Sequence, residues 1–155
     1  MKGNSKITAA LNALLANELA AMDQYFIHSR MYLDWGLHKL HERIDHEFND
    51  EKDHASALIE RILFLEGVPD MSTRSAIHVG KDVPAMLEND LKVEYEVVAM
   101  LKESMALCES EQDFVSRQIL QGLLDDTEKD HAFWLEQQLG LIKKIGLPNY
   151  LQSQL

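Results

Sequence analysis

The tetrapeptide Glu-Lys-Asp-His occurs twice in this chain, at residues 51–54 and 128–131. In a helix, residues three apart share a face, so each copy directs a carboxylate and an imidazole to the same side. Each copy also lies in a stripe of apolar residues at steps of three and four, the spacing of a helix-bundle seam. A buried, unpaired carboxylate is costly and is normally neutralised, paired or bound to a metal. The chain is therefore predicted to be a helical bundle with polar ligands in its interior.

Four apolar stripes predict four long helices, at about 5–36, 37–66, 82–109 and 113–140. Short turns join the first helix to the second and the third to the fourth, so each pair should be antiparallel. The connection at 67–81 is long enough to cross the bundle. We expect an all-α, single-domain chain (1–155): a four-helix bundle at about 5–143 with a long crossover between helices 2 and 3, and a short fifth helix at about 146–155.

Each expected helix has one carboxylate in its stripe, and two helices add an imidazole. The six residues are Glu18, Glu51, His54, Glu94, Glu128 and His131. One Glu from each of two helices plus Glu-x-x-His from each of the other two is the ligand pattern of ferritin-like di-iron and di-manganese proteins. One Glu-x-x-His alone is common on solvated helix faces, but six matching residues on four stripes are hard to produce by accident. The stripe of the second helix contains one further carboxylate, Glu47.

The chemistry of this ligand set favours a redox-active metal pair. Four carboxylates balance the charge of two divalent ions, and two imidazoles give each ion one nitrogen, which leaves positions open for oxygen. Zinc is redox-silent and usually takes more nitrogen or sulfur ligands. The sequence therefore predicts a site for two redox-active metal ions, of the di-iron or di-manganese type.

Charge and cysteine content restrict the partners and the compartment. The formal charge of −11 argues against nucleic-acid binding, which needs a basic surface. No secretory signal and no apolar run of about 18 residues is present, so a membrane span is not expected. The only cysteine, Cys108, cannot form an intramolecular disulfide. We expect a cytoplasmic protein.

Several longer stretches resemble the bacterioferritin and bacterial ferritin family over nearly the whole chain. They are Asn17-Glu18-Leu19, Asp23-Gln24-Tyr25-Phe26, residues 59–67 (Ile-Glu-Arg-Ile-Leu-Phe-Leu-Glu-Gly), Val115-Ser116-Arg117 and Asn149-Tyr150-Leu151-Gln152. The resemblance implies a homo-oligomeric shell of 24 subunits that stores iron. Each subunit would act as a ferroxidase, oxidising Fe(II) with oxygen or peroxide at an intrasubunit diiron site, and the ferric mineral would collect inside the shell.

The resemblance also assigns roles to individual residues. The six seam residues fall on the family's ferroxidase ligands, and Tyr25 matches a tyrosine that supplies an electron near the diiron site. An aromatic seam residue is the alternative reading of Tyr25. His46 and Asp50 match residues that bind iron on the cavity side in some members; without the resemblance they read as a solvated helix face. A ferredoxin-type protein would be the reductant that releases the iron.

Two departures from the family pattern stand out. Haem-binding bacterioferritins have a methionine directly after the ferroxidase Glu of the second helix, where this chain has Lys52. A protonated lysine is a poor haem ligand, so no haem is expected. The chain is also one residue longer between Arg117 and His131, which predicts a π-bulge or a shifted turn. We expect the spacing from Glu128 to His131 to be unaffected.

Two other functions were considered. One is a mainly structural subunit of a mixed shell, assembled with a haem-binding bacterioferritin partner; the complete ligand set argues against a purely structural role, and a mixed shell stays open. A di-iron peroxidase acting on an external reductant would need an electron-transfer domain such as a Cys-x-x-Cys site, which a single cysteine excludes in this chain. The sequence does not choose between oxygen and peroxide, or between a stable diiron cofactor and a transit site.

Overall fold

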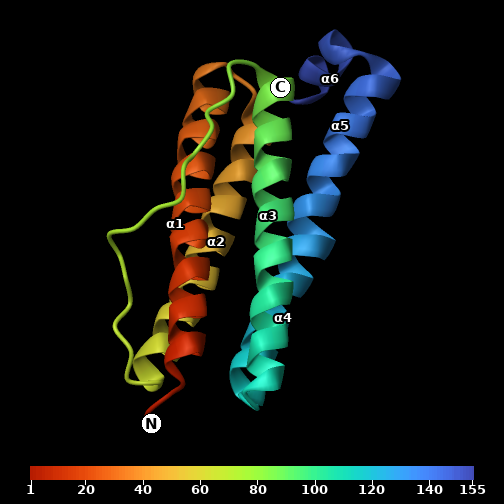
Figure 1. The fold of residues 1–155 in the computed structure, drawn as a ribbon. Helices are drawn as coiled ribbons and strands as arrows, with labels where there is room; N and C mark the ends of the chain where they lie inside the picture. The colour runs from red at the N-terminus through yellow and green to blue at the C-terminus, as the bar shows by residue number, and fades with distance from the viewer.

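The computed structural model describes all 155 residues and contains only helices and their connections (Figure 1). The first three long helices are α1 (Ser5–Asp34), α2 (His38–Phe64) and α3 (Val83–Ser110). The fourth is continuous and consists of α4 (Phe114–Asp126), a π-helical stretch η1 (Thr127–Ala132) and α5 (Phe133–Ile145), before the short α6 (Leu147–Ser153). The predicted bundle with a long crossover and a short last helix is confirmed.

The helix ends follow local chemistry. Asn4, Asp82 and Asp113 precede α1, α3 and α4, and each side chain accepts a hydrogen bond of 2.8–3.0 Å from a backbone N–H in the first turn. Such caps satisfy donors that have no partner within the helix. The fourth helix runs past its predicted end near Gly140 and stops before Gly146, whose φ of 80° suits glycine.

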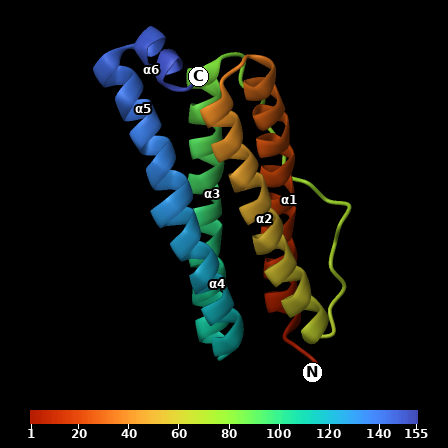
Figure 2. The same ribbon diagram turned by 180° about the vertical axis from the view of Figure 1, so that it is seen from behind.

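The crossover at residues 65–82 runs along the bundle beside α1 (Figures 1 and 2). Near its start the Asn12 side chain donates to the Val68 carbonyl oxygen at 3.0 Å. Near its end the Gly80 N–H donates to Nε2 of the buried His28 at 3.1 Å. These contacts hold the crossover along α1, so that α3 starts at the same end of the bundle as α2 and runs parallel to it (Figures 1 and 2).

The interior has two apolar clusters with a polar layer between them. One cluster is formed by residues of 7–19, 55–65, 97–108 and 120–124, and the other mainly by residues of 21–44, 83–87 and 135. Along each long helix the buried carboxylates and imidazoles lie near the boundary between these groups. The bundle therefore encloses a layer of charged side chains between the two apolar clusters.

None of the helices is both long and apolar enough to cross a membrane.

Candidate metal centre

The first group of inward-facing ligands joins α1 and α2. The Nδ1 atom of His54 lies 3.7 Å from Oε2 of Glu18 and 3.4 Å from Oε2 of Glu51. Glu18 has no exposed surface, and neither of its oxygens has a hydrogen-bond partner. A buried carboxylate in this condition keeps its full desolvation cost unless a cation compensates it. The three residues form a pocket suited to one metal ion.

The second group shares Glu51 with the first. The Nδ1 atom of His131 lies 2.9 Å from Oε1 of Glu51 and 3.5 Å from Oε1 of Glu94. The other oxygen of Glu51 faces His54, and the two imidazole rings are stacked with centroids 5.6 Å apart. Two three-ligand pockets thus meet at one carboxylate, which is the arrangement that bridges two neighbouring metal ions.

Carboxylates outside the pockets orient both imidazoles. Nε2 of His54 is hydrogen-bonded to Oδ2 of Asp126 at 3.1 Å, and Nε2 of His131 to Oδ2 of Asp50 at 3.3 Å. Both Nδ1 atoms are buried and without a hydrogen bond. A metal-binding histidine usually donates its other ring N–H to a carboxylate, which fixes the tautomer and the ring orientation. Both rings therefore present Nδ1 to the pockets.

The charges of the metal-free pockets perturb the pKa values of all five residues. Burial, then the charge of Glu51, raises the pKa of Glu18 well above its usual value and that of Glu94 to about 7. Burial would lower the pKa of His54, but Glu18 and Glu51 raise it to about 11; the pKa of His131 is also raised by its carboxylate neighbours. The protonated imidazoles are the cations of the metal-free site, and a metal ion must displace their protons.

Tyr25 and the predicted cavity-side residues lie next to this centre. The buried Tyr25 hydroxyl donates a hydrogen bond to Oε1 of Glu94. Burial, then the Glu94 charge, raises the pKa of Tyr25 well above its usual value. Nε2 of His46 lies 3.2 Å from Oδ2 of Asp50, and the same oxygen lies 3.3 Å from Nε2 of His131. Asp50 thus connects the half-exposed His46 to the interior.

The sixth predicted ligand is placed elsewhere. The prediction that Glu128 lies in the buried seam beside His131 is wrong: its side chain is 44% exposed and its Oε1 lies 3.2 Å from Nζ of Lys102. The cause is η1, because a π-helix has more residues per turn than an α-helix and positions three apart no longer share a face. Thr127, His131 and Ala132 are the buried residues of this stretch. A π-bulge was expected, but its effect on the Glu128 spacing was not.

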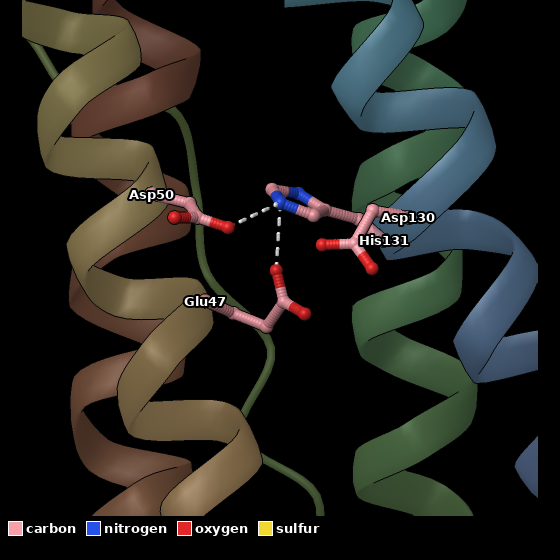
Figure 3. Close-up of side chains that lie close together, drawn as sticks. All are labelled: Glu47, Asp50, Asp130 and His131. Carbon is pink, nitrogen blue, oxygen red and sulfur yellow. Dashed lines mark hydrogen bonds and ion pairs between the residues drawn. The ribbon is translucent and has the colours of Figure 1, made fainter.

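Three carboxylates lie near His131, of which only Asp50 had a predicted role, as a ligand of cavity-side iron. Glu47, Asp50 and Asp130, together with His131, form what we call the outer cluster, whose ligand atoms lie within 4.8 Å of one another. Figure 3 shows Glu47 and Asp50 extending from α2 toward the His131 ring, with Asp130 beside it. Glu47 was visible as a polar residue in an apolar stripe. Asp130, like Asp126, depends on the register of η1, which the α-helical spacing does not give.

Comparison with known proteins agrees with the geometry. Residues 8–145 match the family model described as a ferritin-like domain. This chain belongs to the ferritin family. It is 66% identical over 155 residues to a bacterial ferritin of Synechocystis sp., covering 100% of this chain and 99% of that protein. It is 59% identical to a bacterial ferritin of Pseudomonas aeruginosa, with both chains fully covered.

A more distant relative is a bacterioferritin of Brucella melitensis, 43% identical over 98% of this chain and 94% of that protein. The predicted relation to the bacterioferritin and bacterial ferritin family is confirmed. This ferritin is an iron-storage protein, and family membership together with the carboxylate and histidine clusters supports iron binding, ferroxidase activity and assembly into an oligomeric shell.

Proposed function

We propose that this ferritin oxidises Fe(II) at a dinuclear site within each subunit, formed by Glu18, Glu51, His54, Glu94 and His131. The observation that carries the proposal is the state of Glu18, which is fully buried with no hydrogen bond to either oxygen. Nothing in the chain offsets its desolvation cost fully, whereas a divalent cation does so. All five ligands come from one chain, so the site is complete without a second subunit.

The arrangement suits a two-electron reaction. Each of two Fe(II) ions bound on either side of Glu51 gives up one electron. Molecular oxygen that takes both electrons and two protons becomes hydrogen peroxide, and peroxide that takes two electrons and two protons becomes two water molecules. The three carboxylates favour the ferric product because they stabilise the higher metal charge. The ferric ions are then stored as mineral in a shell of 24 subunits.

Two neighbouring groups have supporting roles in the proposal. Tyr25, hydrogen-bonded to Glu94, is an electron donor next to the site. His46 and Asp50 bind iron on the cavity side only transiently and more weakly than the dinuclear site does, and Asp50 contacts both His46 and His131. Tyr25→Phe removes the redox-active hydroxyl and keeps the ring. We expect this variant to bind iron normally but to lose any tyrosyl radical signal that accompanies oxidation in the wild type.

Haem has no part in this function. Lys52 directly follows Glu51 and is exposed on α2. A homo-oligomer prepared with haem available is expected to show no Soret band, because an exposed ammonium group does not ligate haem iron. A Soret band that disappears in Lys52→Ala would contradict this interpretation.

The test of the proposed site is a comparison of Fe(II) oxidation rates in matched variants. Glu51→Gln keeps the side-chain shape but removes the shared charge, so we expect the rapid phase of oxidation to slow by at least about tenfold. Glu60→Gln makes the same change at an exposed position of the same helix and should leave the rate unchanged. Equal rates in the wild type and Glu51→Gln would exclude the proposed site.

A further inference from the structure

The outer cluster already contains a cation that belongs to the protein. Arg43 of α2 places Nη2 2.5 Å from Oε1 of Glu47 and 2.8 Å from Oδ1 of Asp130. Its guanidinium also lies 4.8 Å from the centroid of the Trp134 ring. The side chain is 25% exposed, so the charge is partly shielded from water. Arg43 therefore links α2 to the π-helical stretch through the same carboxylates that are arranged as metal ligands.

The contacts of Arg43 leave polar atoms unsatisfied. Glu47 is only 2% exposed, and neither of its oxygens has a hydrogen bond of good geometry, although both are close to positive groups. Nε of Arg43 is also buried without a partner. A guanidinium normally binds a carboxylate through two parallel hydrogen bonds, which this geometry does not provide. Arg43 offsets only part of the negative charge of the cluster. A metal ion would coordinate the oxygens of Glu47, which have no hydrogen bond.

We propose that Arg43 is a built-in counter-cation that keeps a third iron ion out of the outer cluster. This inference rests on the proposed dinuclear site, because His131 belongs both to that site and to the outer cluster. A metal ion among Glu47, Asp50 and Asp130 would lie next to the guanidinium and be repelled by it. Removal of the Arg43 charge converts the outer cluster into a third metal site that adjoins the first two through His131.

The test uses Co(II) binding to the metal-free, assembled protein under argon, followed by equilibrium dialysis and metal analysis. Moderate ionic strength weakens adventitious binding to the acidic surface. We expect two tightly bound Co(II) ions per subunit in the wild type. Arg43→Met, which keeps an apolar side chain against Trp134, should bind a third ion at least about tenfold more tightly than the wild type does.

Three further variants separate charge from structure. Arg43→Lys keeps the positive charge and should retain two ions. The double variant Arg43→Met/Asp130→Asn loses a ligand of the new site and should also return to two. Arg30→Met is the matched control, because Arg30 likewise bonds a carboxylate, Asp45, at 2.7 Å and lies 5.4 Å from the ring centroid of Phe26; it should leave the count at two.

The outcomes distinguish this inference from the proposed function. Two ions with unchanged affinities in Arg43→Met would overturn the role of Arg43 and leave the dinuclear site intact. Fewer than two tight ions in the wild type would instead contradict the dinuclear site itself. If Arg43→Met does not fold, Arg43→Gln gives the same test, since it keeps a donor for Asp130 but carries no charge.

Discussion

Replacement of Glu18 by methionine should stabilise the metal-free protein and abolish the stabilisation that metal gives. Glu18 has no exposed surface and no hydrogen bond, and burial raises its pKa well above the usual value. Replacing buried ionic groups by apolar ones of similar volume is often neutral or stabilising by about 1–4 kcal/mol. Neither oxygen of Glu18 has a hydrogen bond, and His54, 3.7 Å away, keeps the closer carboxylate of Glu51 at 3.4 Å when Glu18 is replaced. We therefore expect a gain of about 2 kcal/mol. For a chain of this length that corresponds to a rise of about 4–8 °C in the unfolding midpoint.

The sign of the pH dependence follows from the raised pKa of Glu18. The folded protein holds the proton more tightly than the unfolded chain, so the carboxylate destabilises the fold above its ordinary pKa, near 4.5. The advantage of Glu18→Met should therefore be larger at pH 8 than at pH 5.

The assay is thermal unfolding at one scan rate, with and without Co(II). The wild type should gain stability from Co(II) by mass action, and Glu18→Met should gain much less. The unfolding midpoint of the wild type should therefore lie below that of Glu18→Met without metal and above it with Co(II). Glu60→Gln, at an exposed position, serves as the control. A metal-free Glu18→Met that unfolds well below the wild type would refute the reasoning, because Glu18 would then be stabilised by the protein alone.

Three further predictions concern protons and the fourth helix. The pKa values of His54, His131, Glu18 and Glu94 are all raised, that of His54 to about 11 and that of Glu94 to about 7, so Co(II) binding at pH 7 should release at least about two protons per subunit. Calorimetry in buffers of different ionisation enthalpy measures this release, and a heat independent of buffer would contradict it. Without metal, the stabilisation from protonated His54 should be complete below about pH 6.5 and lost as pH rises through about 11, as urea unfolding at several pH values would show. Glu128→Gln should change the affinity for the first two Co(II) ions less than about twofold, since Glu128 pairs with Lys102; a loss like that of Glu51→Gln would show that Glu128 is a ligand.

The sequence predicted the bundle well because its apolar residues recur at the regular spacing of α-helices. Apolar residues at steps of three and four located all four long helices, and α1 and α3 begin at the predicted ends. The same spacing located five inward-facing groups, because a polar residue in an apolar stripe faces the interior when the helix is regular. Glu18 and Glu94, each a single acidic residue in its stripe, are both fully buried.

The sequence failed where the helix is not regular. The extra residue before His131 indicated a π-bulge, but only the structure shows that it turns Glu128 outward and brings Asp126 and Asp130 toward the imidazoles. Which turn absorbs an extra residue depends on packing against the other helices rather than on local propensity. Arg43 was missed for a related reason, since a basic residue beside acidic ones reads as a solvated face until its neighbours on another helix are known.

The central claim is that each subunit holds two iron ions bridged by Glu51. The most direct test is Mössbauer spectroscopy of metal-free protein given two equivalents of ⁵⁷Fe(II) per subunit without oxygen, then one equivalent of oxygen and rapid freezing. The account predicts a magnetically coupled pair of Fe(III) ions in the wild type and none in Glu51→Gln. Isolated high-spin Fe(III) in the wild type, or the same coupled pair in both proteins, would contradict it.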